Sequence, residues 1–260
     1  MSEVGSHLLG RNVSPPDARD YPLSAFLESS DPLDTTLAEL LKSKSVAKAT
    51  KNWAVIATER IKILMPAPVP PPTIPTDPVS WNNIEPVLDQ GETPHCVGFA
   101  GAQWGNTLPI NDKFVNEDGH RFYYACKVFD GEPNEENGST SRSLGKALKA
   151  AGRLNTYAFA ASIDEAVQWI MTNGPVLFGT DWYTGMFNPN SRGFVEPTGN
   201  IEGGHMYLAI GYNPLTEVIE YLNSWSDMWG INGRFYMHKR DAVKIFANQG
   251  EGLVAVELPL

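Results

Sequence analysis

The pattern of hydrophobic and polar residues changes from helical to strand-like within residues 79–260. Residues 96–105 and 143–151 are predicted to form helices, the second of which is closed by Gly152. The later part has short apolar or alternating segments separated by Gly, Asn and Pro, a pattern typical of strands. These predicted strands are residues 175–179, 206–212, 217–222 and 233–237. Helices followed by strands predict an α+β fold with two unlike lobes.

Two regions of different composition precede this domain. Residues 1–64 form an N-terminal extension, in which a helix is predicted over 34–41 because apolar residues at helical spacing follow a capping Asp34. Residues 53–64 form either a second helix or a strand, and periodicity does not decide between them. Residues 65–78 contain seven prolines in fourteen positions, which predicts an extended, semi-rigid linker.

Composition limits the classes of function. Of the 260 residues, 42% are hydrophobic and 19% are charged, which predicts a globular protein. The net charge of −10 argues against general nucleic-acid binding, so no nucleic acid is expected as a partner. No apolar run approaches the ~18 residues of a transmembrane helix, and the N-terminus lacks the basic and apolar parts of a signal peptide. We therefore expect no membrane partner, and a cytoplasmic location is favoured.

The chain has two cysteines, Cys96 and Cys126. They lie thirty residues apart, and no Cys or His pair has the spacing of metal ligands, so neither a metal nor an organic cofactor is expected. Cys126 ends the apolar run of residues 122–126 and is predicted to be a buried small hydrophobic residue. So few cysteines fit a protein that works in a reducing compartment without disulfides.

Three side chains in separate local motifs could together form a cysteine nucleophile, its base and the group that orients the base. Cys96 lies near the start of a predicted helix, which Thr93 is expected to cap with Pro94 in its first turn, so the helix dipole favours a thiolate. His205 follows a Gly-Gly pair at the start of a predicted strand, and Asn223 begins an Asn-Ser-Trp segment. Taken singly, each also has a structural interpretation: a buried cysteine, a structural histidine and a strand edge.

Together these motifs resemble the papain family of cysteine peptidases over roughly residues 79–260. Residues 223–233, with Asn-Ser-Trp followed by Trp-Gly, are the most specific part of the resemblance, and residues 123–148 look most like the bacterial and phage members. The resemblance implies a papain-like α+β fold with a helical lobe, a strand-rich, barrel-like lobe and an N-terminal extension. It also implies a thiol protease that hydrolyses peptide bonds of a peptide or protein substrate through a thioester acyl-enzyme.

The resemblance assigns a role to each residue of the site. Cys96 would be the nucleophile, His205 would take the thiol proton and give it to the leaving amine, and Asn223 would orient the imidazole. Gln90, six residues before Cys96, would donate a hydrogen bond to the developing oxyanion. Trp225 would cover the bond between His205 and Asn223. The substrate-binding residues that the resemblance implies are Gly138, Ser139, Gly204 and Trp225.

His95, next to Cys96, is expected to be exposed and not to be the base, because adjacent helix side chains do not face each other. Two other functions remain open: a papain-like module with a structural or assembly role, such as a phage-particle component, and an amidase or endopeptidase acting on cell-wall peptides. The extension, residues 1–64, could be a pro-segment that restricts the cleft, or an attachment arm that binds a protein partner. A phage-particle-associated location is favoured alongside the cytoplasmic one.

Overall fold

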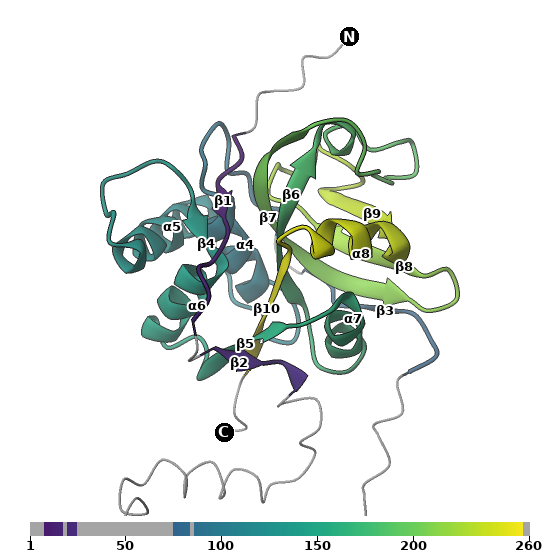
Figure 1. The fold of residues 1–260 in the computed structure, drawn as a ribbon, viewed down its shortest axis with the longest axis horizontal. Helices are drawn as coiled ribbons and strands as arrows, with labels where there is room; N and C mark the ends of the chain where they lie inside the picture. Colours follow the sequence, from purple (N-terminus) through teal and green to yellow (C-terminus); the bar gives the residue numbers. More distant parts are fainter. Residues whose placement is uncertain (1–7, 18–19, 25–74, 84–85, 257–260) are drawn as a thin grey trace, which may run out of the picture. The chain divides into compact units, whose positions relative to one another are not determined.

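The computed structural model describes residues 8–17, 20–24, 75–83 and 86–256 (Figure 1). These residues belong to one compact unit. The predicted elements over 34–41 and 53–64, and linker residues 65–74, lie outside the described residues and stay predictions. Within the described residues, no helix is long and apolar enough to cross a membrane.

One lobe consists of helices. They are α4 (Cys96–Gly105), α5 (Asn116–Asp130) and α6 (Ser141–Ala150), which lie together on one side of the molecule in Figure 1. The two predicted helices are confirmed as α4 and α6, with a shift of two residues at the start of α6. The sequence pattern did not predict α5.

Local chemistry sets the ends of α5 and α6. Before α5, the backbone N–H of Val115 donates to the Asp118 carboxylate at 3.0 Å. Gly131 ends the helix with φ 80°, a left-handed conformation that glycine adopts without steric cost. α6 begins where the Thr140 hydroxyl oxygen accepts from the backbone N–H of Ser143 at 3.1 Å, which is a standard N-cap.

The second lobe is built on a sheet with the strand order β2-β5-β10-β6-β7-β8-β9, and β3 pairs with β7. Among these pairs only β2 and β5 run parallel. Two helices pack on the sheet, α7 (Ile163–Thr172) and α8 (Lys239–Ala247). The strands are β2 (Tyr21–Pro22), β3 (Val79–Ser80), β5 (Thr156–Ala160), β6 (Val176–Tyr183), β7 (Ile201–Asn213), β8 (Val218–Leu222), β9 (Arg234–His238) and β10 (Glu251–Val256).

The four predicted strands are confirmed as β6, β7, β8 and β9, and the α+β fold with two unlike lobes is confirmed with them. β7 begins at Ile201, five residues earlier than predicted, because it continues to pair with β6 as far as Tyr183. His205 therefore lies inside a strand, opposite Thr180, and its predicted place at a strand start is wrong.

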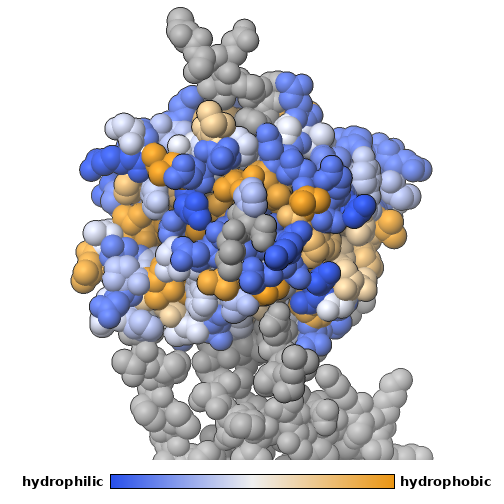
Figure 2. All heavy atoms as spheres, turned by 180° about the vertical axis from the view of Figure 1, so that it is seen from behind, coloured by the Kyte–Doolittle hydropathy of each residue, from blue (hydrophilic) through white to orange (hydrophobic). Residues whose placement is uncertain are grey.

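The buried apolar residues form a core in which both lobes meet. It includes Phe99 and Leu144 from the helices and Met206 and Leu208 from β7. The rear face of the molecule, by contrast, carries mostly hydrophilic side chains with hydrophobic residues scattered among them (Figure 2). Within this core, α4 packs on α5, α6 and the sheet.

α4 is buried along its whole length, and glycine makes its closest packing possible. A Cβ atom at Gly98 would lie 2.2 Å from the carbonyl oxygen of Gly119 in α5, so the two backbones would have to separate. A Cβ at Gly101 would instead meet the Cδ1 of Leu144 at 2.6 Å, and the end of a leucine side chain can move.

This difference predicts unequal effects of two alanine substitutions in one helix. Gly98→Ala should lower the free energy of unfolding by about 1–3 kcal/mol more than Gly101→Ala, because both gain the same helix propensity but only the first forces two backbones apart. Urea denaturation followed by circular dichroism measures both. Equal stability of the two variants would contradict this account of the α4–α5 contact.

Candidate active site

His205 and Asn223 form a buried hydrogen-bonded pair in the strand-rich lobe. His205 lies within β7, and Asn223 follows the last residue of the adjacent β8. Nε2 of His205 is 2.8 Å from Oδ1 of Asn223. Because an amide oxygen only accepts, Nε2 carries the proton, and Nδ1 of a neutral ring is then the nitrogen that can take one. This is the geometry of a base with a fixed tautomer.

Two tryptophans enclose the His205 ring. Trp225 stacks on it with ring centroids 4.8 Å apart and an interplanar angle of 27°, and Trp182 meets it edge-on at 4.9 Å. Trp225 is only 1% exposed, so it keeps water from the His205–Asn223 bond as expected, which strengthens that bond. Its predicted contact with a substrate stays a prediction.

Cys96 is the first residue of α4, so its expected position in the first helical turn is confirmed. The expected cap by Thr93 is wrong. The N-cap residue is His95, which makes no capping bond through its side chain. The Thr93 hydroxyl instead donates to the backbone carbonyl of Gln90 at 2.7 Å, where it closes the turn before the helix.

The Cys96 sulfur lies beside the residue that follows His205. Burial raises the pKa of the Cys96 thiol to about 11, against the smaller opposing effect of the backbone N–H groups of Met206, Gly10 and Val97, which hydrogen-bond to the sulfur. Because Met206 follows His205 in β7, this contact places the thiol next to the residue that carries the imidazole. In this arrangement the thiol is protonated at neutral pH.

Gln90 holds its side-chain amide close to the start of α4. Its Oε1 accepts from the Ser224 hydroxyl at 2.7 Å, which fixes the orientation of the amide. Nε2 donates to the carbonyl oxygen of Thr93 at 2.8 Å and to that of Leu8 at 3.0 Å. The amide N–H thus already binds a backbone carbonyl oxygen, the kind of group that an oxyanion donor must recognise.

Gln103, which the sequence analysis did not identify, joins the two lobes. It lies two helical turns after Cys96, and its Nε2 donates to the backbone carbonyl of Asn223 at 2.7 Å. Its Oε1 accepts from the backbone N–H of Leu88 at 3.2 Å. Because buried polar groups need partners, these bonds fix α4, which begins with Cys96, relative to Asn223. The sequence feature that could have identified Gln103 is that it is a polar residue in a helix of otherwise apolar and small residues.

Residues 8–14, here called the strap, run between the two lobes and were not predicted to do so. They contain β1 (Arg11–Asn12), which pairs in parallel with β4 (Ser139–Thr140) and lies between α5 and β7 in Figure 1. The backbone N–H of Ser139 donates to the carbonyl oxygen of Gly10 at 2.8 Å. Since the N–H of Gly10 bonds to the Cys96 sulfur, the strap passes directly over the thiol.

Two glycines let the strap backbone pass. A Cβ atom at Gly138 would lie 2.2 Å from the carbonyl oxygen of Gly10, and one at Gly204 would lie 2.0 Å from that of Arg11. Gly138 also has φ 82°, which disfavours any other residue. The predicted substrate-binding residues Gly138, Ser139 and Gly204 therefore line one path, and the strap lies in it.

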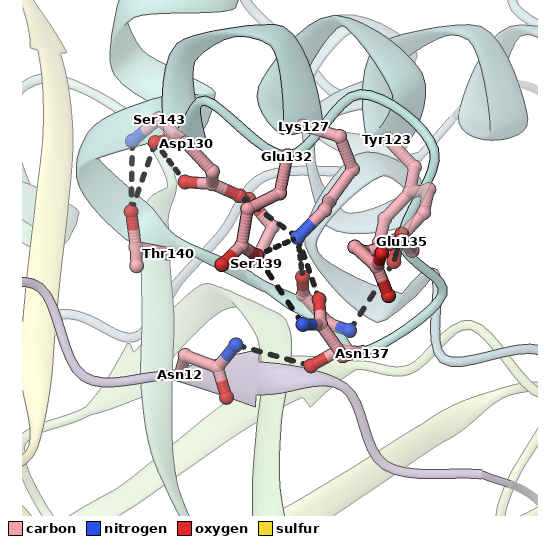
Figure 3. A network of polar contacts seen from close by, with 11 residues as sticks. Asn12, Tyr123, Lys127, Asp130, Glu132, Glu135, Asn137, Ser139, Thr140 and Ser143 are labelled. Carbon is pink, nitrogen blue, oxygen red and sulfur yellow. Dashed lines mark hydrogen bonds and ion pairs between the residues drawn. The ribbon is translucent and has the colours of Figure 1, made fainter.

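A buried lysine fixes the loop that leads into β4 (Figure 3). Lys127 Nζ donates to Asn137 Oδ1 at 2.6 Å, to Glu132 Oε2 at 2.9 Å and to the carbonyl oxygen of Gly138 at 3.1 Å. The Asn12 side chain of the strap donates to the carbonyl oxygen of Asn137 at 3.1 Å. The buried, fully hydrogen-bonded ammonium group of Lys127 thus holds in place the strand β4, which pairs with the strap.

His95 is not exposed, contrary to the expectation from sequence. It is 2% exposed, its ring stacks on Tyr123 at a centroid distance of 3.7 Å, and burial lowers its pKa against the opposing effect of Glu136. Nδ1 lies 2.7 Å from Nδ1 of His120, and Nε2 lies 2.5 Å from Glu136 Oε2. Both ring nitrogens are engaged, which fits the expectation that His95 is not the base.

Cys126 is a buried free thiol, as expected, and Cys96 is likewise not in a disulfide. Burial raises the pKa of the Cys126 thiol, which makes it unreactive at neutral pH. No group of three or more His, Cys, Asp and Glu side chains among the described residues is placed to hold a metal ion.

Comparison with known proteins places the chain among cysteine proteases. A family model described as papain family cysteine protease matches residues 111–250, more than half of the 260 residues. A cathepsin B of Dictyostelium discoideum is 36% identical over 81 residues, which are 30% of this chain and 26% of that protein. An uncharacterized peptidase C1-like protein of Acanthamoeba polyphaga mimivirus is 26% identical over 147 residues, 53% of this chain and 46% of that protein. The matched part is thus less than half of either relative.

Two solved structures share the fold. Xylellain, a cysteine protease from Xylella fastidiosa, superposes with a TM-score of 0.65 at 18% identity and covers 100% of this chain and 99% of its own. A procathepsin B from Trypanosoma congolense gives a TM-score of 0.50 at 12% identity, covering 66% of this chain and 72% of its own. The expected papain-like fold is therefore confirmed.

The strap predicts how the two thiols react. At pH 7.5, iodoacetamide should label both cysteines slowly in the unchanged protein, because the Cys96 thiol is buried with its pKa raised to about 11. Gly10→Ala should displace the strap, since its Cβ would lie 1.9 Å from the Pro94 carbonyl oxygen. It should then speed labelling of Cys96 about tenfold and leave Cys126 unchanged.

Peptide mapping by mass spectrometry distinguishes the two sites, and Val13→Ala is the matched control because this strap side chain is 44% exposed. Rapid labelling of Cys96 in the unchanged protein would contradict the arrangement. So would equal acceleration of both thiols in the Gly10 variant.

Proposed function

The chain belongs to the papain family of cysteine proteases, and we propose accordingly that it hydrolyses peptide bonds through a thioester acyl-enzyme. The observation that carries the proposal is the buried hydrogen bond from His205 Nε2 to Asn223 Oδ1, which leaves Nδ1 to act on the thiol. The contact of the Cys96 sulfur with the backbone of Met206 supports the pairing of thiol and imidazole.

In the first half of the proposed reaction, the Cys96 thiol gives its proton to Nδ1 of His205. The sulfur attacks the carbonyl carbon of the substrate, and the oxygen takes up the negative charge. Gln90 Nε2 and the backbone N–H of Cys96 would donate hydrogen bonds to that oxygen. When the C–N bond breaks, the leaving amine takes the proton from His205 and a thioester remains.

In the second half, His205 removes a proton from water, and the resulting hydroxide attacks the thioester carbonyl. The C–S bond breaks, and the acid product and the Cys96 thiolate form; the thiolate then takes back the proton from His205. Asn223 and Trp225 would act only through His205, by holding the ring direction and excluding water. We further propose that substrate residues on the acyl side pair with the edge formed by Gly138 and Ser139, opposite Gly204.

These roles predict an order of severity among substitutions. His205→Ala should lower kcat on the order of 10⁴-fold or more, because the base is lost. Asn223→Ala should lower it about 100-fold, since the imidazole remains but its orientation is degraded. Steady-state hydrolysis of a fluorogenic peptide, measured in the Gly10→Ala background, tests both.

His238→Ala, a histidine of β9, is the matched control and should change kcat less than about twofold. The assignment of the base fails if His205→Ala retains turnover while the protein remains folded. A larger loss for Asn223→Ala than for His205→Ala would equally contradict it.

We also propose that the strap is an intramolecular inhibitor, the pro-segment alternative for the N-terminal extension. Support comes from the contacts of Gly10 with Cys96 and of Leu8 with Gln90, since both groups are needed by a substrate. The strap runs parallel to β4, which is opposite to the direction of a substrate whose acyl side lies along this edge. The strap would therefore occupy the cleft without presenting a peptide bond to Cys96 in the direction that the proposed reaction needs.

Inhibition by the strap predicts activation by a single substitution in the full chain. Gly10→Ala should raise kcat/KM for a small peptide about tenfold, because the open form becomes more populated. Val13→Ala should have no effect. If Gly10→Ala leaves both kcat/KM and the circular dichroism spectrum unchanged, the strap is not an inhibitor and the attachment arm is favoured.

We also propose where the protein is located. The two free thiols support a reducing location, cytoplasmic or phage-particle-associated. A structural role in a particle and cleavage of cell-wall peptides are the other functions that the same site allows. Hydrolysis of casein peptides by the Gly10→Ala protein, with none by its Cys96→Ala derivative, would favour the general peptidase over both.

A further inference from the structure

The side chain of His95 is held on three sides, although it makes no capping bond to α4. Its Nε2 atom lies 2.5 Å from Glu136 Oε2, and its Nδ1 atom lies 2.7 Å from Nδ1 of His120. The ring also stacks on Tyr123 at a centroid distance of 3.7 Å and an interplanar angle of 17°. We name these four residues the His95 clamp.

The carboxylate of Glu136 sets the direction of the hydrogen bonds in the clamp. An ionised carboxylate only accepts, so Nε2 of His95 carries the proton that is donated to Glu136. Nδ1 of the neutral His95 ring then accepts, and the hydrogen between the two rings belongs to Nδ1 of His120. Both nitrogens of a buried ring are thus bonded, which holds the ring in one orientation.

The partners of His95 are themselves held in place. The ring of His120 in α5 meets the ring of Phe99 edge-on at a centroid distance of 4.9 Å. Glu136 lies in the loop between α5 and β4, and its Oε1 accepts from the Tyr124 hydroxyl at 3.0 Å. The clamp therefore ties the residue before α4 to two other segments of the helical lobe, so that His95 cannot turn by itself.

His95 shares a peptide unit with Cys96, and the N–H of this unit is one of the two proposed oxyanion donors. The carbonyl oxygen of the same unit accepts the first hydrogen bond of α4, from the backbone N–H of Phe99 at 3.1 Å. His95 has φ −95° and ψ 13°, values between the helical and the extended regions. The helix alone therefore does not set these two angles, on which the direction of the Cys96 N–H depends.

We propose that His95 is a positioning residue for the reaction, whose clamped side chain fixes the direction of the Cys96 N–H toward the oxyanion. This inference rests on the proposed function. Removing a whole oxyanion donor costs roughly 10²–10³ in kcat, and a donor that is only loosened should cost less. The loss should appear in kcat and not in KM, because the donor acts on charge that develops in the transition state.

Glu136 is the member of the clamp to change, because its side chain is 50% exposed and its variants should fold. In the Gly10→Ala protein, Glu136→Ala should lower kcat per titrated active site about tenfold and change KM less than twofold. Glu136→Gln should keep kcat within about twofold, since its amide oxygen still accepts from His95 Nε2. Hydrolysis of a fluorogenic peptide measures both constants.

Glu135→Ala is the matched control and should change neither constant. It removes the neighbouring exposed carboxylate, whereas the contact of Glu135 with the Tyr123 hydroxyl is made by the backbone carbonyl, which alanine keeps. Counting only titrated active sites prevents a loss of folded protein from imitating a loss of kcat.

A second measurement needs no turnover. With ¹⁵N in cysteine alone, the unchanged full chain gives two backbone amide signals by NMR, from Cys96 and Cys126. The Cys96 signal should shift in Glu136→Ala and stay in Glu136→Gln. The Cys126 signal should stay in both, and it reports any general disturbance of α5, because Cys126 lies three residues after Tyr123 in that helix.

Full kcat in Glu136→Ala, an equal loss in Glu136→Gln or Glu135→Ala, or a loss carried by KM would each overturn the proposal. An unmoved Cys96 signal in Glu136→Ala, or equal shifts of both cysteine signals, would do the same. If the Gly10→Ala parent itself has no turnover, the peptidase function is rejected, and the Cys96 signal alone then decides whether the clamp fixes this N–H.

Discussion

The site depends on one buried side-chain amide that ties the two lobes together. Gln103 donates to the backbone of Asn223 and accepts from that of Leu88, so α4 cannot slide along the sheet without leaving polar groups unpaired in the core. The thiol begins this helix, and the imidazole lies on the strand that the helix packs against. Their relative position is thus set by hydrogen bonds two helical turns away from the chemistry.

A second constraint is the narrow backbone path between the lobes. Gly138 on one side and Gly204 on the other leave room for a main chain but not for Cβ atoms on the walls. An extended backbone fits this path, and the N–H of Ser139 pairs there with the carbonyl oxygen of Gly10 in the strap. Side chains of a segment that lies in this path must point away from it, as the buried side chain of Arg11 does.

The sequence predicted those features whose signal is local. α4, α6 and four strands were predicted because the apolar pattern of each element, and the glycines that end it, fall within a stretch of about ten residues. α5 was missed because its first turn is polar and contains Gly119, which weakens the helical pattern, although that glycine is what lets Phe99 pack. The burial of His95 could not be foreseen, since its partners His120 and Glu136 lie 25 and 41 residues away. The strap has no periodic signal, and it bonds to residues more than 80 positions away.

The strap and the domain that it contacts are parts of one polypeptide, so the inhibition proposed for the strap would not depend on the concentration of the protein. A separate inhibitor is lost on dilution, whereas a tethered one keeps an effective concentration set by its connection, on the order of millimolar for a short flexible tether. The degree of the proposed inhibition would then be the same in dilute and in crowded solution. Release from the proposed inhibition would then require a change in the chain itself, such as a cut between Ser14 and the domain.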